Sequence, residues 1–401
     1  MYNQQDNLDQ LLILRVNELS WDPSLQHFLH RLHPGGVVID APLTAGAEAV
    51  REFLFKVACS LPAVPFLALR EEGGAMDPLR DFLPPLPSPR AVAGKGLAAV
   101  RRLGELVGAA FELLGFNTDL APLLDLASPH PSSARRAGAC VGLDRCDRRP
   151  YNLLPGYFQG NEGEFAEPAG EASETRAFSS NPLEVAKCAA AFLEGLEPHE
   201  VRACGKHFPS LATAQSSNNT EPPLVSKSMA ELWREDLVPY RALLPRLSLV
   251  LVSTAAYKAY DFDLLQTAGL SPKVVEGLLR VKLGYAGVAI AGGLEMEAVR
   301  GTMTLEEAAV DALRAGCDML LLDKAEAAER ALGALNAARD SGKLPSDRIE
   351  QALKRIQLAK KGLKPPRGHL SPRSLERVAS EFTDFSSGFA DSGRSKFENR
   401  K

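Results

Sequence analysis

Short apolar runs recur along the chain, each about the length of a buried strand. They occupy residues 35–39, 65–69, 117–120, 203–208, 247–253, 287–291 and 319–322. Runs of this kind that are bounded by turn-forming residues are typical of strands. Longer segments with helical patterns separate them, at residues 47–59, 96–114, 182–195, 229–244, 272–281, 305–315 and 325–340. This alternation predicts βα units around a parallel sheet.

Helix start signals support this division of the chain. Ser228 and Glu231 have the spacing of a capping box, and Pro272 follows Ser271 at a first helical position. A last helix over residues 346–362 is expected to pack on the exterior. Seven or eight βα units that close on themselves make a TIM-type (β/α)8 barrel. We therefore predict a single α/β barrel with its chemistry at the carboxyl ends of the strands.

Two segments depart from this pattern. Residues from about 128 to 175 are rich in Arg, Gly, Pro and Glu and have few apolar runs, so we expect a long inserted loop over one barrel mouth. Residues 365–401 are polar, and we expect them to form a disordered tail. The predicted organisation is a barrel over residues 1–364, with the insertion inside it and the tail behind it.

Composition narrows the range of partners. The formal net charge is −4 and the isoelectric point is about 6.1. Nucleic acid and anionic membranes require a basic face, so neither is an expected partner. The start MYNQQDNLDQ has neither the basic nor the apolar part of a signal peptide, which favours a cytoplasmic location. The six cysteines form no CxxC pair, so we expect no metal site, no disulfide framework and no cofactor.

Five sequence blocks occur in an order and spacing that resemble a known family. They are RAFSSNPLEVAKCAAAFLEGL, ACGKHFP, SMAELWREDLVPYRALL, LSPKVVEGLLRVKLGYAGVAI and LEMEAV, between residues 176 and 299. Weaker matches, such as EEGGAMDPLRDF and GFNTDLAPLLDLASP, extend the resemblance over most of residues 10–340. The chain resembles the N-terminal barrel domain of glycoside hydrolase family 3, in its single-domain β-N-acetylglucosaminidase (β-N-acetylhexosaminidase) branch.

The resemblance implies a retaining glycosidase, but its catalytic groups are replaced here. The family nucleophile is the first Asp of a Ser-Asp-Asp-Leu-x-Met run, and Gly292 stands at that position. The family acid/base is a His-Asp dyad on a loop; Leu211 replaces the His and Ser217 the Asp, with Asn219 close behind. Glycine has no side chain, and leucine and asparagine have no proton to transfer near neutral pH.

Sugar-binding positions are altered only in part. Arg70 stands where the family has an Asp before Gln-Glu-Gly-Gly, and Ala256 stands where it has a His. Arg176, Lys206 and His207 match positions that bind sugar hydroxyls in the family. Each has a plainer interpretation. Lys206 and His207 could simply fix the barrel mouth, and Arg176 could form a surface ion pair with Glu72 or Glu174.

These replacements lead to three hypotheses. The first is a catalytically inactive barrel that binds an amino sugar or cell-wall fragment, or that binds a protein partner. The second is a divergent glycosidase that recruits other carboxylates, for which Glu71, Glu295 and Asp323 are candidates. The third is a purely structural paralogue without a ligand. Asp318 is expected to be structural, and Glu72 to support the Gly-Gly turn that follows it.

Overall fold

A closed barrel of eight parallel strands forms the centre of the molecule. The computed structural model describes residues 7–127, 175–214, 221–262, 265–366 and 369–390. The barrel strands are β1 (Leu12–Val16), β2 (Gly36–Ile39), β3 (Phe66–Leu69), β4 (Thr118–Asp119), β5 (Arg202–Phe208), β7 (Leu249–Val252), β9 (Val288–Ala291) and β10 (Met319–Leu322). Pairing of β1 with both β2 and β10 closes the ring. The predicted TIM-type fold is confirmed.

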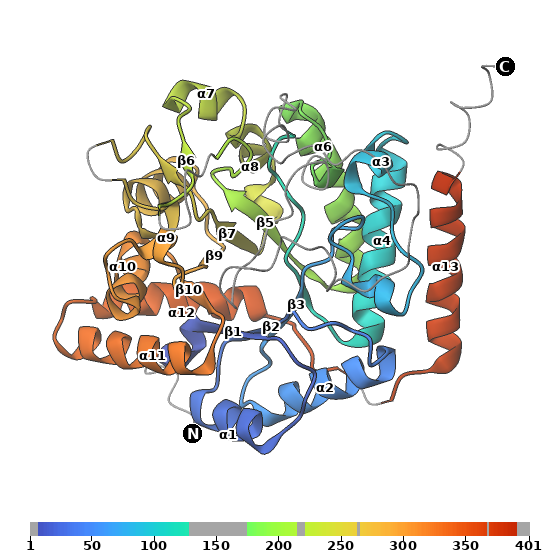
Figure 1. Cartoon of the computed structure of the whole chain (residues 1–401), viewed down its shortest axis with the longest axis horizontal. Coiled ribbons are helices and arrows are strands. Elements are labelled where there is room, and N and C mark those ends of the chain that lie inside the picture. The colour runs from blue at the N-terminus through green and yellow to red at the C-terminus, as the bar shows by residue number, and fades with distance from the viewer. Residues whose placement is uncertain (1–6, 128–174, 215–220, 263–264, 367–368, 391–401) are drawn as a thin grey trace, which may run out of the picture.

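Helices surround the barrel (Figure 1). The α-helices are α1 (Pro23–Leu32), α2 (Ala47–Ser60), α3 (Pro89–Ala93), α4 (Leu97–Leu114), α6 (Pro182–Leu196), α7 (Met229–Arg234), α8 (Leu237–Leu243), α9 (Glu297–Arg300), α10 (Leu305–Ala315), α11 (Ala325–Asp340), α12 (Ser346–Lys360) and α13 (Pro372–Ala390). The remaining elements are the 3₁₀ helices η2 (Leu8–Leu11), η3 (Pro78–Asp81), η5 (Glu197–His199), η6 (Leu244–Arg246) and η7 (Ala268–Leu270), the π-helix η8 (Lys273–Lys282), and the short strands β6 (Leu224–Val225) and β8 (Ala256–Tyr257).

Every predicted apolar run forms a barrel strand, and the eighth strand was missed. Strand β1 is the run LILRV, which is buried along its whole length. The predicted helix over residues 229–244 is divided into α7 and α8, which a break at Glu235 separates. Pro239 accounts for the break, because its ring would clash with the Glu235 carbonyl in a continuous helix and it has no N–H to donate. The capping box of Ser228 and Glu231 is present at the start of α7.

Close packing of α4 on α6 depends on two glycines. A Cβ atom at Gly104 would overlap the carbonyl oxygen of Phe192, and one at Gly195 would overlap the carbonyl oxygen of Arg101. The two backbones therefore approach more closely than any larger residue would permit. This contact holds α4, which follows β3, against α6, which precedes β5.

The expectation of a disordered tail from residue 365 is wrong for residues 372–390. They form α13, which lies beside α4 (Figure 1). Val378 and Phe382 are buried in this contact, and Arg102 Nη2 donates to Glu381 Oε2 at 2.9 Å. The average composition is polar, but apolar residues at helical spacing give the segment one buried face. Residues 391–401 and the expected insertion at 128–174 lie outside the described residues.

The last predicted helix forms as α12, with Ile349 and Ile356 buried. It also contributes to a charge cluster at the amino end of β10. There the fully buried Asp318 accepts hydrogen bonds from Arg348 Nη2 and Arg355 Nη1, each at 3.0 Å, and pairs with Arg280. Asp318 thus has the structural role that was expected of it.

Candidate functional site

The carboxyl ends of β3 and β5 meet in a buried ion-pair cluster centred on Glu72. Arg176 Nε and Nη2 donate to the two carboxylate oxygens of Glu72 at 2.8 and 2.7 Å. Lys206 Nζ lies 2.5 Å from Glu72 Oε1. The exposed fractions are 4% for Glu72, 3% for Arg176 and 1% for Lys206. Arg176 therefore does pair with Glu72, but in the interior and not on the surface.

The charges in this cluster shift each other's protonation. Burial alone would raise the pKa of Glu72, but the cations of Lys206 and Arg176 hold it well below its usual range. Burial lowers the pKa of Lys206 to about 8, against the opposing effect of Glu72. The cluster is thus a carboxylate between two cations at neutral pH, with Lys206 the group most easily discharged.

The side chain of Glu71, and not that of Glu72, supports the Gly-Gly turn. Gly73 N donates to Glu71 Oε1 at 2.7 Å, and the Glu71 side chain is fully buried. Burial and the neighbouring carboxyls of Asp77 and Asp119 raise the pKa of Glu71 well above its usual value. Burial also raises the pKa of Asp77 to about 6. The prediction that Glu72 supports this turn is corrected accordingly.

His207 is held by Asp125. Its Nδ1 lies 2.8 Å from Asp125 Oδ2, and the other carboxylate oxygen accepts the backbone N–H of Leu211 at 2.9 Å. Burial lowers the pKa of His207 although Asp125 opposes the shift, so a neutral imidazole is favoured. Leu211 contributes only its backbone to this arrangement, and its side chain packs against the core. Ser217 and Asn219 lie outside the described residues.

Gly292 follows directly after β9, and it is the residue that the sequence resemblance places at the nucleophile position. A Cβ atom placed there would have as its three nearest neighbours carbon atoms of Leu251 and Leu321, at 3.7 to 3.9 Å. These are ordinary van der Waals distances, so the site could hold a larger residue. No side chain occupies this point, and its immediate surroundings are apolar.

A second charged group lies at the ends of β1, β2 and β10. Arg15 Nη1 lies 3.3 Å from Asp40 Oδ2, and Arg15 Nε lies 3.1 Å from Asp323 Oδ1. Arg70 Nη2 is 4.0 Å from Asp40 Oδ1, so Arg70, which the sequence comparison predicted to be an altered sugar-binding position, joins this group. The sequence interpretation missed Arg15, although a charged residue within the apolar run LILRV was a usable signal. Asp40 was missed as well.

The three carboxylates proposed as substitutes differ in how far they are available to take up or release a proton. Glu295 accepts the backbone N–H groups of Asp323 and Lys324 at 3.0 to 3.1 Å, which ties it to the start of α11. Glu71 is fully buried. Asp323 is the exception, because burial, with help from Glu295, raises its pKa to about 7 although Arg15 lowers it. Of the three, Asp323 is best suited to exchange a proton near neutral pH.

Ala256, which the sequence resemblance places at a family His position, is buried in the small sheet that β8 forms with β6. Its methyl group offers no hydrogen bond. Within the described ranges, no group of three or more His, Cys, Asp and Glu side chains could hold a metal ion. No helix of those ranges is long and apolar enough to cross a membrane.

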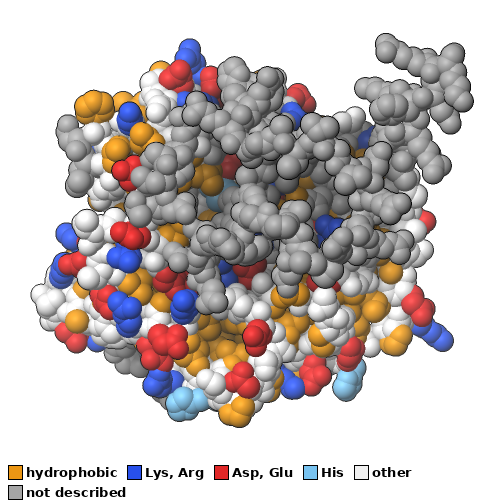
Figure 2. Space-filling model, in the orientation of Figure 1, with side chains coloured by type: hydrophobic (Ala, Val, Ile, Leu, Met, Phe, Trp, Pro, Cys, Tyr) orange, Lys and Arg blue, Asp and Glu red, His pale blue; other side chains and the backbone are white. Residues whose placement is uncertain are grey.

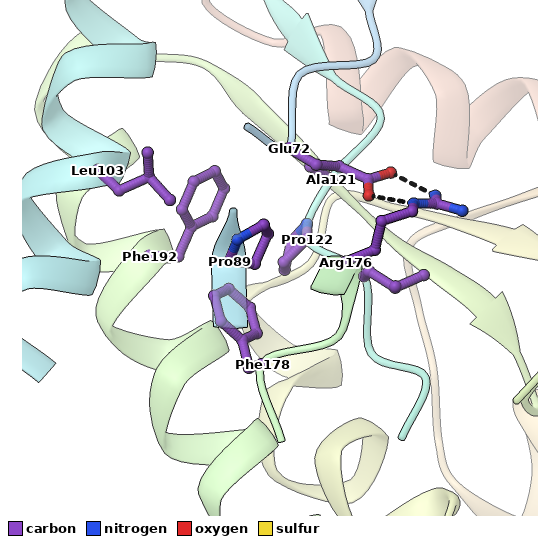
Figure 3. Close-up of a pocket in the computed structure, with 9 residues that line it drawn as sticks. Glu72, Pro89, Leu103, Ala121, Pro122, Arg176, Phe178 and Phe192 are labelled. Carbon is purple, nitrogen blue, oxygen red and sulfur yellow. Dashed lines mark hydrogen bonds and ion pairs between the residues drawn. The ribbon is translucent and has the colours of Figure 1, made fainter. Parts of the chain in front are cut away.

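An apolar wall closes one side of the Glu72–Arg176 pair (Figure 3). Pro89, Phe178 and Phe192 line a space of only about 10 Å³ beside it, enough for about one water molecule. On the outer face, basic and acidic side chains are interspersed, without a continuous field of one sign in the visible part (Figure 2).

Comparisons with known proteins agree with this architecture. Residues 166–359 match the model of the glycosyl hydrolase family 3 N terminal domain. A β-hexosaminidase of Pseudomonas aeruginosa (strain LESB58) is 29% identical over 308 residues, which cover 76% of this chain and 80% of that protein.

Solved structures share the fold. A β-N-acetylhexosaminidase from Beutenbergia cavernae superposes with a TM-score of 0.74 at 20% identity, covering 90% of this chain and 99% of that one. A fungal multi-domain β-N-acetylglucosaminidase superposes with a TM-score of 0.78 at 24% identity over 96% of this chain. This chain spans 43% of that longer protein.

Proposed function

We propose that this chain is a member of glycosyl hydrolase family 3, as the match of residues 166–359 and the β-hexosaminidase relative support, and that it binds an amino sugar without hydrolysing it. The main observation in favour of this proposal is that a glycine, Gly292, follows β9. A retaining glycosidase needs a carboxylate on one face of the sugar and an acid/base group on the other. The position after β9 has no side chain, and its nearest neighbours are leucine carbons. At the matching position of the dyad, Leu211 has nothing to transfer.

Binding is supported by the groups that remain. An ammonium has three donors, and the described residues give Lys206 Nζ a single carboxylate contact, to Glu72. Arg176 is held by Glu72, and His207, which follows Lys206 in β5, is held by Asp125. Buried polar side chains held by neighbours are well suited to bind hydroxyl groups, because they lose little freedom when the ligand arrives.

The test combines binding and turnover on one sample. Thermal unfolding is measured with N-acetylglucosamine and muropeptide fragments, and hydrolysis with an aryl β-N-acetylglucosaminide. We expect a rise in melting temperature without product release above a boiled control. Lys206→Met should abolish the rise, whereas Lys187→Met, at an exposed ion pair on α6, should retain it. Turnover would refute inactivity, and no thermal shift with any sugar would refute sugar binding and favour a protein partner.

A second candidate is a divergent glycosidase, and Asp323 is the observation that favours it. Its pKa of about 7 suits a general acid or base, and it lies beside Glu295 at the barrel mouth. This candidate predicts slow hydrolysis of the aryl substrate that Asp323→Asn abolishes and Lys206→Met only weakens. Absence of hydrolysis in the wild-type protein would eliminate it.

A further inference from the structure

A separate cleft lies beside the carboxyl end of β1. Its volume is about 320 Å³, and it lies between β1, the loop that leads to α1, α1 itself and the residues that follow β10. Cavities of about 300 Å³ and more are the usual size of small-molecule sites. Gly292, Arg176, Lys206 and His207 do not line it. The cleft is therefore distinct from the sugar site proposed above.

The charged side chains that line the cleft are mainly acidic. Glu18, Asp22 and Asp323 supply three carboxyl groups, and Arg15 supplies the one basic side chain. The charge of Arg15 is already shared between Asp40 and Asp323. Asp22 also caps α1, where it accepts the N–H of Leu25 at 2.9 Å. The balance of charge favours a positively charged ligand over an anion.

Asp323 is the most deeply placed of these carboxyls. Its side chain is only 5% exposed, and Arg15 Nε contacts its Oδ1 at 3.1 Å. Among the described residues, none donates a hydrogen bond to its Oδ2. A carboxylate accepts up to about four hydrogen bonds. Asp323 thus has unused acceptor capacity in a nearly buried position on the cleft wall.

An apolar wall faces these groups. Leu25 and Phe28 of α1 line the cleft together with Leu14 and Ala325. A bare metal ion would leave this wall and most of the volume unused, and no described cluster has the three His, Cys, Asp or Glu ligands that a metal ion needs. The combination of a buried carboxyl group and an apolar wall matches a ligand with one cationic end and a short hydrocarbon body.

We propose that this cleft binds a small organic amine, with its ammonium group on Asp323 and its carbon chain against Leu25 and Phe28. The amine nitrogen donates to the carboxylate, and the hydrocarbon displaces water from the apolar wall. This site is independent of the sugar site proposed at Arg176, Lys206 and His207, whereas it shares Asp323 with the divergent-glycosidase candidate.

Protonation of Asp323 gives the site a dependence on pH. The charged groups that act on this carboxyl are Arg15 of β1, Asp40 after β2, Glu295 before α9 and Lys324 before α11. Arg15 and Lys324 favour its ionised form, whereas burial and the two carboxylates oppose it, and the pKa is raised to about 7. An ammonium ion binds the ionised form. Affinity should therefore be about tenfold lower at pH 6 than at pH 8, following the ionised fraction.

The experiment is calorimetric titration of the full-length protein with n-butylamine, and with 1-butanol as the uncharged probe. We expect the amine to bind and the alcohol not to bind. Asp323→Asn should weaken amine binding at least tenfold and remove its pH dependence. Asp340→Asn, at an exposed carboxylate near the end of α11, is the matched control and should bind as the wild type does.

Three results would overturn the proposal: no binding of the amine to the wild type, equal binding of butanol, or unchanged amine affinity in Asp323→Asn. Circular dichroism tests whether this variant is folded. If it is unfolded, Glu18→Gln at the same cleft provides the second test, because loss of one lining carboxylate should weaken amine binding about two- to fivefold. An unchanged affinity there would also count against the proposal.

Discussion

Two adjacent glutamates after β3 should respond in opposite ways to the same substitution. Glu72 is ionised between Arg176 and Lys206, and its pKa lies well below the usual range. Glu71 lies among the carboxyls of Asp77 and Asp119, and its pKa is raised well above its usual value, first by burial. Glutamine has nearly the same shape as glutamate but no charge. It therefore removes a required charge at Glu72 and an unfavourable one at Glu71.

The expected magnitudes follow from these environments. Glu72→Gln leaves two buried cations without their carboxylate, and breaking a buried pair in this way costs about 3–5 kcal/mol. Glu71→Gln retains the acceptor for Gly73 N–H, and its amide can replace the hydrogen bond that Glu71 makes to Asp77. We expect this variant to be as stable as the wild type near pH 5 and more stable at higher pH.

The sign follows from the direction of each shift. A raised folded pKa contributes stability at low pH that is lost as pH rises towards the folded pKa. Between the unfolded and folded pKa values of Glu71, the wild type loses about 1.4 kcal/mol per pH unit through this group, whereas Glu71→Gln does not. A lowered folded pKa acts oppositely. The contribution of Glu72 is complete above its unfolded pKa, and it is lost only in strong acid.

The assay is urea unfolding followed by tryptophan fluorescence at pH 5, 6, 7 and 8. Trp21 lies just before α1 and Trp233 lies in α7, two elements that are well separated in the fold (Figure 1). Glu350→Gln, exposed on α12, is the control and should follow the wild type at every pH. If Glu71→Gln and Glu72→Gln destabilise equally at pH 7, and the advantage of Glu71→Gln does not grow with pH, then Glu71 is ionised in the folded protein and the reasoning fails.

Four further substitutions test the packing and the site. Gly104→Ala should lower stability in urea unfolding by about 1–3 kcal/mol, because the methyl group meets the α6 backbone. Gly333→Ala in α11 has open space around its Cβ and should raise stability by up to about 1 kcal/mol; the same sign for both would refute the close approach. Phe382→Ala should lower the free energy of unfolding by about 3 kcal/mol and make α13 more sensitive to proteolysis. If α13 were undocked in the wild-type protein, the substitution would change neither quantity. Gly292→Asp should remain folded yet release no aryl product, because Leu211 still supplies no proton, and turnover would contradict this account.

The secondary structure was largely predictable from the sequence. The apolar runs fixed seven barrel strands, because a buried parallel strand needs apolar residues on both faces. Capping residues such as Ser228 marked helix starts, since their side chains satisfy free backbone N–H groups within three residues. The wrong predictions of secondary structure also had local causes. Pro239 divides the helix that was predicted as continuous, and the polar average composition of residues 365–401 concealed the apolar face of α13.

The residues at Gly292 and Leu211 could be read from the chain, because residue identity alone decides whether a side chain or a transferable proton exists there. The partners of the remaining groups could not. Arg176 and Glu72 are 104 positions apart in sequence, and they meet only because ring closure brings their segments to one mouth. Protonation depends on the same closure. Glu71 and Glu72 are chemically identical neighbours, and only tertiary burial and nearby charge decide that one favours its proton while the other loses it.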